Sequence, residues 1–148
     1  MKDRIKTISL CSLALFCSSI LSCTVSNHGK SGVQAAMRRY DHLIMNLDAD
    51  SIALLYTVDG NLGDIAIGRD SIRAFLSSFK NVQVLSQMST TRSLSIRRDT
   101  AIQKGLYTQT DIISGKDTMR VKGEFIARWQ WVQNGGWQIK KMSTKPTK

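Results

Sequence analysis

The sequence predicts an α+β domain in which three amphipathic helices precede four long antiparallel strands. Two observations indicate this order. Up to about residue 79, apolar residues recur at steps of three and four, which is the spacing of one helix face. After Asn81 the chain becomes rich in Val, Ile, Ser and Thr, and apolar residues alternate with polar ones as they do on a strand. One face of such a sheet must be covered, and the helices are the cover that the sequence offers.

Each expected helix is defined by an apolar stripe. The stripe of the first helix consists of Val33, Ala36, Met37, Tyr40, Ile44 and Leu47. Asp48 is suited to cap a short second helix, because its carboxylate can accept a bond from a free N–H of the first turn. The apolar side of that second helix is formed by Ile52, Leu55 and Tyr56. The third helix begins at Gly68, and its apolar face comprises Ile72, Phe75, Leu76 and Phe79.

Strands are expected over residues 82–97, 100–113, 119–132 and 137–144. The third of these alternates over its whole length, and its apolar face consists of Met119, Val121, Gly123, Phe125, Ala127, Trp129 and Trp131. The stretch QNGG before the last strand is a strong hairpin signal, since Asn and Gly adopt the positive φ angles of tight turns.

The first 23 residues differ from the rest of the chain. A short basic segment precedes the apolar run ISLCSLALFCSSILS, which has the length of a signal peptide. The run ends at Cys23 in ILSC, which resembles the lipobox of bacterial lipoproteins, and all three cysteines lie in this segment. The expected organisation is a lipoprotein signal peptide over 1–22, an acylated Cys23 with a flexible tether over 23–32, and the domain over 33–148. The expected location is the cell envelope, at the periplasmic face of the outer membrane.

Composition argues against several partners and cofactors. The net charge is +10, but the basic residues are scattered pairs without interleaved aromatic residues, so no nucleic acid is expected. No Gly-rich phosphate loop or dinucleotide motif is present, and no cofactor is expected. His28 falls in the tether and His42 on the polar side of its helix, so no metal site is expected.

Four stretches, AAMRRY, DADSIALLYTVDG, GRDSI and GGWQIKKMS, together carry a family resemblance. In this order they resemble the nuclear-transport-factor-2-like superfamily, which includes SnoaL-like proteins and ketosteroid isomerases. The resemblance covers roughly residues 33–144. It implies a cone-shaped, strongly curved antiparallel sheet wrapped around the three helices, with an apolar pocket inside.

The resemblance also implies site residues. In ketosteroid isomerases an aspartate is the base, and a tyrosine and a protonated acid form the oxyanion hole. By this resemblance, Tyr40 occupies the position of the oxyanion tyrosine and Asp64 the position of the base. Tyr56 occupies the position of a tyrosine that supports the hydrogen-bond network. Phe125 occupies the position of the protonated acid, and its side chain can donate no hydrogen bond. Because one lost oxyanion donor costs about 2.7–4 kcal/mol in the transition state, steroid isomerisation is not expected.

Two roles are open for the acids of LYTVDGNLGD. Asp59 is expected to shape the turn. Asp64 is either a desolvated base with a raised pKa or a solvated carboxylate of the loop, and the resemblance favours the pocket. The expected ligand pocket consists of Tyr40, Tyr56, Asp64, Phe125 and Trp129, although aromatic residues on a covered face usually belong to the core.

The leading hypothesis is therefore a membrane-anchored protein whose SnoaL-like domain binds a small, largely apolar molecule or a partner protein. The first alternative is a proton-transfer enzyme of the isomerase, dehydratase or cyclase type, with Asp64 as base and Tyr40 as hydrogen-bond donor. The second alternative is an interaction module that forms a homodimer through the outer face of the sheet. The enzyme requires Asp64 and Tyr40 to face one closed pocket, whereas the binding protein requires only an apolar cavity.

Overall fold

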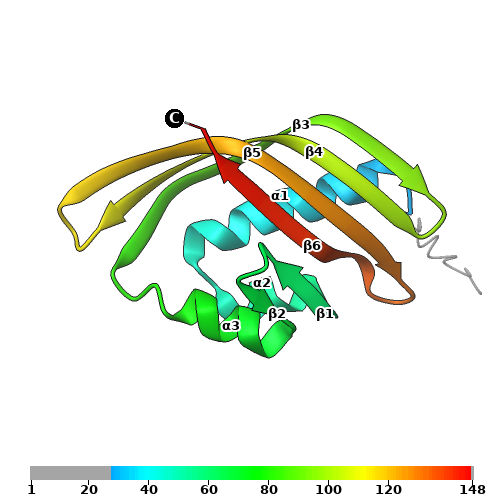
Figure 1. Ribbon diagram of the computed structural model, residues 1–148, viewed down its shortest axis with the longest axis horizontal. Coiled ribbons are helices and arrows are strands. Elements are labelled where there is room, and N and C mark those ends of the chain that lie inside the picture. Colours follow the sequence, from blue (N-terminus) through cyan, green and yellow to red (C-terminus); the bar gives the residue numbers. More distant parts are fainter. Residues whose placement is uncertain (1–27, 148) are drawn as a thin grey trace, which may run out of the picture.

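A strongly curved sheet covers the helices of this chain (Figure 1). The computed structural model describes residues 28–147; Cys23 and the expected signal peptide lie outside them. The helices are α1 (Lys30–Asn46), α2 (Ala49–Leu54) and α3 (Arg69–Ser77). The strands are β1 (Tyr56–Leu62), β2 (Ala66–Ile67), β3 (Val82–Arg97), β4 (Thr100–Ile113), β5 (Asp117–Val132) and β6 (Gly136–Pro146).

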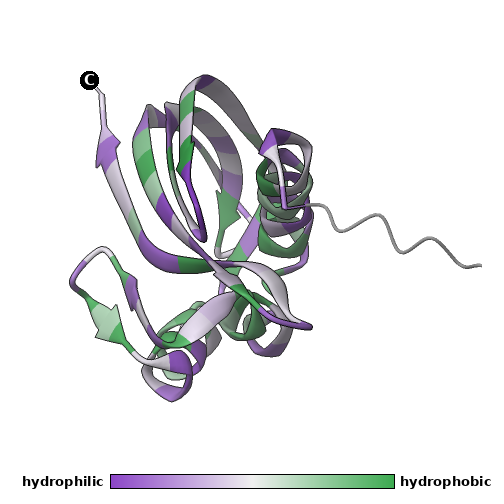
Figure 2. Cartoon of the chain, turned by 90° about the vertical axis from the view of Figure 1, so that its right-hand side faces the viewer, coloured by the Kyte–Doolittle hydropathy of each residue, from purple (hydrophilic) through white to green (hydrophobic). Residues whose placement is uncertain are grey.

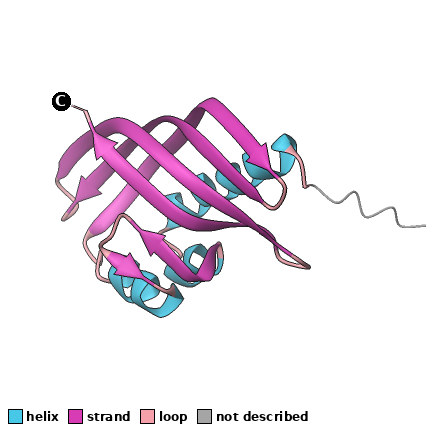
Figure 3. Ribbon diagram, turned by 45° about the vertical axis from the view of Figure 1, so that its right-hand side comes forward, coloured by secondary structure: helices cyan, strands magenta, loops and turns pink. Residues whose placement is uncertain are grey.

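The predicted α+β cone is confirmed, and its sheet is open rather than closed on itself. The strand order is β2-β1-β6-β5-β4-β3, and β1 pairs with β6 in parallel while the other pairs are antiparallel. Helix α1 runs along the concave side of the sheet, and α2 and α3 lie at one end beneath it (Figure 3).

The strands β1 and β2 were not among the elements expected from the sequence. The sequence pattern predicts Tyr56 on the apolar side of the second helix, but α2 ends at Leu54 and Tyr56 begins β1. The side chain of Tyr56 is fully buried all the same. The sheet is consequently mixed, and not purely antiparallel as expected, because β1 joins it in parallel to β6.

The N-terminal boundary of the domain lies slightly before its expected position. Helix α1 begins at Lys30, so residues 30–32, assigned to the tether, belong to the helix. His28 also contacts the domain: its ring centroid lies 4.4 Å from that of Trp131 and 5.4 Å from that of Trp137. After α1, the cap expected for the second helix is confirmed: Asp48 is the N-cap of α2, and the Ser51 N–H donates to Asp48 Oδ1 at 3.0 Å.

The core lies between α1, α2, α3 and the concave face of the sheet. Hydrophobic and hydrophilic residues alternate in bands along the strands (Figure 2). Phe125, Ala127 and Trp129 of β5 are all buried, which confirms the predicted inner face of that strand. The indole of Trp129 donates to Gln103 Oε1 at 3.0 Å, so its polar atom is satisfied inside the core.

The curvature of the sheet depends on close backbone contacts and on irregular pairing. A Cβ atom on Gly105 of β4 would lie 2.1 Å from the carbonyl oxygen of Thr90 and 2.7 Å from the Phe125 ring. The edge strand β3 has two register shifts against β4, one between Val84 and Ser86 and one between Thr91 and Ser93. A bulge inserts an extra residue and increases the local bend.

The expected hairpin at QNGG is confirmed. Asn134 adopts a φ of 60° and Gly136 a φ of 72°, and the Gly135 N–H donates to the Val132 carbonyl at 3.0 Å.

Among residues 28–147, no helix combines the length and the apolar character needed to cross a bilayer.

Candidate functional site

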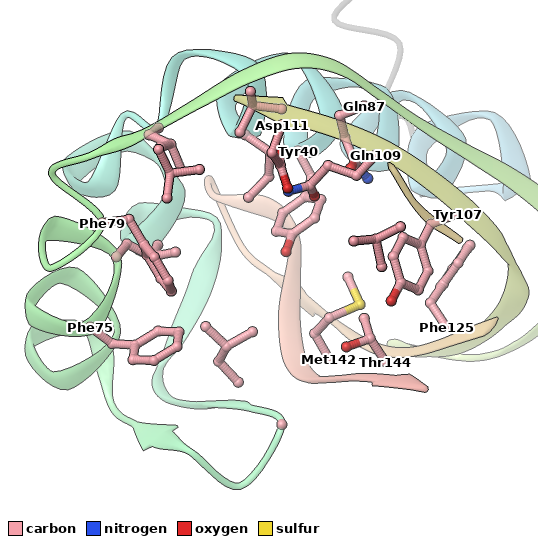
Figure 4. Close-up of a pocket in the computed structure, with 18 of the residues that line it drawn as sticks. Tyr40, Phe75, Phe79, Gln87, Tyr107, Gln109, Asp111, Phe125, Met142 and Thr144 are labelled. Atoms are coloured by element: carbon pink, nitrogen blue, oxygen red, sulfur yellow. The ribbon is translucent and has the colours of Figure 1, made fainter. Parts of the chain in front are cut away.

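The concave side of the sheet encloses a cavity of about 490 Å³ (Figure 4). Most of its walls are apolar, and this apolar lining consists of Ile44, Leu47, Leu62, Ile65, Phe75, Leu76, Phe79, Val82, Val84, Ile113, Met119, Val121, Phe125 and Met142. Ile65, Phe79 and Met119 are exposed and form the rim. A cavity of this size, with few polar groups, suits a small organic molecule.

One end of the cavity is polar and is formed by Tyr40, Gln87, Gln109 and Asp111. Figure 4 shows these four side chains beside one another, whereas Phe75 and Phe79 lie toward α3. Asp111 is the notable member, because only 4% of its surface is exposed. Its two carboxylate oxygens accept bonds from Gln109 Nε2 at 2.9 and 3.0 Å. The cavity therefore contains a buried carboxylate.

A bulge brings Gln87 to this end. Side chains of a regular strand alternate, so Val84 on the inner face would be followed inward by Ser86 and Met88. The register shift after Val84 turns Gln87 and Ser89 inward instead. The local irregularity of β3 thus decides which side chains the cavity presents.

Asp41 of α1 holds these two inward-turned residues in place. Its carboxylate accepts from the Ser89 N–H at 2.9 Å, from Ser89 Oγ at 2.7 Å and from Gln87 Nε2 at 3.1 Å. These bonds link α1 directly to the edge strand β3. The helix and the polar end of the cavity are therefore one connected unit.

Tyr40 of the cavity lining and the buried Tyr56 beside it stay protonated at physiological pH. Burial raises the pKa of Tyr40 to about 12; the Tyr56 hydroxyl opposes this rise, and the negative charge of Asp41 adds to it. Burial also raises the pKa of Tyr56 well above its usual value, and Tyr40 contributes to that shift. The Tyr56 hydroxyl is buried, and it makes no hydrogen bond of good geometry with any group among residues 28–147. Tyr40 is thus a neutral hydroxyl that faces the cavity.

The structure brings together only part of the expected site. Tyr40 and Phe125 line the cavity, as expected. Tyr56 and Trp129 lie in the core and are not part of the lining, since their side chains are enclosed by other residues. Asp64 is also absent from the lining, although its neighbours Gly63 and Ile65 belong to it.

Asp64 is a solvated turn residue and not a desolvated carboxylate. Its side chain is 68% exposed, and Lys141 Nζ lies 2.7 Å from Asp64 Oδ1. Its backbone has a φ of 61°. Asn61 Nδ2 donates to Asp64 Oδ1 at 2.8 Å, and the Asp64 N–H donates to Asn61 Oδ1 at 2.8 Å. The expectation of a raised pKa is wrong: hydrogen bonds from Lys141 and Asn61 lower the pKa of Asp64.

The turn role expected for Asp59 belongs to Asp64. Asp59 lies within β1, where its carboxylate accepts a bond from Thr57 Oγ1 at 3.0 Å and pairs with Lys140. Asp64 therefore has the turn role expected for Asp59, and neither acid lines the cavity. The condition set for the proton-transfer enzyme, Asp64 and Tyr40 facing one closed pocket, is not met.

Replacing Asp64 with asparagine is expected to lower the melting temperature slightly at neutral pH. Asparagine tolerates the positive φ but loses the ion pair with Lys141. Because the folded-state pKa of Asp64 is lowered, its carboxylate stabilises the fold above the unfolded-state pKa, and this is lost as the pH falls through the folded value, below 3.8. Thermal melts across pH should show wild type and variant converging at acid pH. Lys141→Met should give the same profile, and a variant that is more stable at neutral pH would contradict this assignment.

Asp111 was missed in the sequence. Tyr107, Gln109 and Asp111 alternate on the inner face of β4, so an acid at an inward position was the available signal.

His42 is exposed on α1. Over residues 28–147, no three side chains of His, Cys, Asp or Glu come together as the ligands of a metal ion would.

Similar folds occur among solved structures. A ketosteroid isomerase-like protein from Erwinia carotovora atroseptica superposes with a TM-score of 0.72 at 19% identity, covering 82% of this chain and 98% of that chain. A protein of unknown function from Mycobacterium tuberculosis gives 0.71 at 20% identity, covering 80% and 71%. An NTF2-like protein with a cystatin-like fold from Novosphingobium aromaticivorans gives 0.63 at 16% identity, covering 77% and 79%.

These similarities establish the fold. The domain has the nuclear-transport-factor-2-like architecture found in ketosteroid isomerase-like proteins. No protein-family model and no curated protein matches the sequence.

Proposed function

We propose that this domain binds a small, largely apolar molecule in the cavity beneath its curved sheet. The observation that carries the proposal is the cavity of about 490 Å³, whose walls are apolar except for a few convergent polar side chains. An apolar ligand that enters it removes both its own surface and the walls from water, which is favourable by roughly 25 cal/mol per Å² of apolar area.

The cavity also argues for binding rather than steroid isomerisation. Phe125, at the position of the isomerase acid, is buried and lines the cavity, so it offers a ring where that chemistry needs a second donor. Tyr40 supplies one hydroxyl, and Asp64, the expected base, lies outside the lining.

Replacing Val121 with phenylalanine is expected to weaken binding of Nile red, a neutral apolar dye, by at least about tenfold. Val121 is a half-buried lining residue of β5, so the larger ring would occupy the space of the ligand. The matched control is Ile126→Phe, which adds a ring to the outward face of the same strand. Fluorescence titration measures both variants. Equal dye affinity for Val121→Phe and wild type would exclude the cavity as the binding site.

We further propose that the domain is held at a bacterial membrane through acylated Cys23, in the cell envelope. The support is the segment ILSC after an apolar run, together with the absence of cysteine from the rest of the sequence. An anchored domain would meet its ligand at the membrane, where apolar molecules collect.

Cys23→Ser is expected to move the protein from the membrane fraction to the soluble fraction, because serine cannot carry the thioether-linked lipid. Cys17→Ser, within the same apolar run, is the matched control and should remain in the membrane fraction. Fractionation and mass spectrometry of the mature N-terminus check this. An unmodified Cys23 in the mature protein would disprove the anchor.

A further inference from the structure

The polar end of the cavity offers hydrogen-bond acceptors that the protein itself leaves incompletely satisfied. Asp111 is almost completely buried, and a carboxylate has about four acceptor positions. Within residues 28–147, the donor found for it is one side-chain nitrogen, Gln109 Nε2. A buried carboxylate with a single neutral donor is under-satisfied, and further donors would stabilise it.

Gln87 supplies a second free acceptor. Its Nε2 donates to Asp41, and because a carboxylate can only accept, this bond fixes which side of the amide carries the oxygen. Gln87 Oε1 is then left buried without a partner among the described residues. A buried carbonyl oxygen without a donor is destabilising, so this oxygen favours any ligand group that donates to it.

Positive charge is missing from the same region. The described lining of the cavity includes no Lys, Arg or His, and Asp111 is its one acidic side chain. Asp41 stands behind Gln87 and adds a second acid next to the polar end. A cation in the cavity would therefore lie near two carboxylates, and no positively charged side chain of the described lining would compete with it.

From these contacts, and on the premise of the proposed function, we infer that the ligand is an amphipathic primary amine. Its ammonium group lies at the polar end, where its three N–H donors match the Asp111 carboxylate, Gln87 Oε1 and the Tyr40 hydroxyl oxygen. Its apolar body extends along the aromatic and aliphatic walls toward Phe75 and Phe79 at the α3 side (Figure 4). An anionic ligand is disfavoured, because its charge would face a buried carboxylate.

Three probes that differ only in their head group test this inference on the full-length chain: 4-phenylbutylamine, 4-phenylbutan-1-ol and 4-phenylbutanoate, titrated at neutral pH by isothermal titration calorimetry. The amine should bind at least about tenfold more tightly than the alcohol, since a charge-assisted hydrogen bond is roughly twice as strong as a neutral one. The butanoate should bind most weakly. An alcohol or butanoate that binds as tightly as the amine overturns the inference but leaves the apolar cavity as a binding site. Failure of all three probes to bind overturns the proposed function and the inference together.

Asp111→Asn tests whether the Asp111 carboxylate causes the preference for the amine over the alcohol. The variant keeps the shape of the side chain and removes the charge, so the affinities for amine and alcohol should converge while alcohol binding persists. Asp117→Asn removes an exposed acid at the start of β5, outside the lining, and should leave the preference for the amine unchanged. A preference for the amine that survives in Asp111→Asn would overturn the role of this carboxylate. If Asp111→Asn does not fold, Gln87→Met removes the second acceptor and should reduce amine binding more than alcohol binding; an equal reduction overturns the inference.

Discussion

Replacing Phe125 with alanine is expected to lower the free energy of unfolding by about 3–5 kcal/mol, the usual cost of truncating a fully buried phenylalanine. Phe125 is 3% exposed, and its ring contacts the inner face of β4 at Gly105. Removing the ring deletes this contact and enlarges a space that is already partly empty, and the rigid strands on either side cannot collapse to fill it. In a domain of this size the melting temperature should fall by roughly 10–20 °C.

The control for this prediction is Ile126→Ala on the same strand. Ile126 is 43% exposed on the outer face, so its truncation should cost under about 1 kcal/mol. Chemical denaturation of both variants gives the two free energies. Similar losses for Phe125→Ala and Ile126→Ala would show that the two faces of β5 are assigned the wrong way round.

Gly105→Ala is expected to destabilise the fold by about 1–3 kcal/mol or more, although it adds only one methyl group. The new Cβ would lie 2.1 Å from the Thr90 carbonyl oxygen, and backbone cannot move aside as a flexible side chain can. Relief requires β3 and β4 to separate or the Phe125 ring to shift. Both movements would flatten the sheet at its bend, so Nile red binding should also weaken.

Gly29→Ala is the matched control for the glycine position. Nothing lies within 4 Å of a Cβ placed on Gly29, and its φ of −91° suits any residue, so the cost should be at most about 1 kcal/mol. Calorimetric melts and dye titrations of the two variants compare the effects. A Gly105→Ala protein as stable as Gly29→Ala would mean that the close approach of β3 and β4 does not limit the bend.

The long helices and strands could be predicted because the apolar pattern of each one repeats over many residues. The stripe of α1 and the alternation of β5 extend over many residues, and both were assigned to the correct face. β1 could not be predicted in the same way. It is short, and its partner β6 follows about 80 residues later, so its existence depends on a distant contact that no local pattern records.

The candidate site was predictable only in part, for a related reason. Tyr40 and Phe125 lie on long regular elements, and their inward orientation follows from periodicity. The roles of Asp59 and Asp64 depend on which residue receives the positive φ of a turn, and mutual bonds with Asn61 decide that locally. The inward position of Gln87 depends on a bulge, which shifts the alternation by one residue without a clear mark in the sequence.

The two bulges of β3 also bear on how the protein avoids aggregation. β3 lies at the edge of the sheet, and a regular edge of that length would offer a row of free N–H and C=O groups to a strand of another molecule. The bulges divide it into short segments, 82–84, 86–91 and 93–97, that no straight strand could pair with continuously. The extra residue of the second bulge is the exposed Arg92, whose charge would be costly to bury against a neighbour. The irregularity that shapes the cavity therefore also keeps copies of the chain from joining edge to edge.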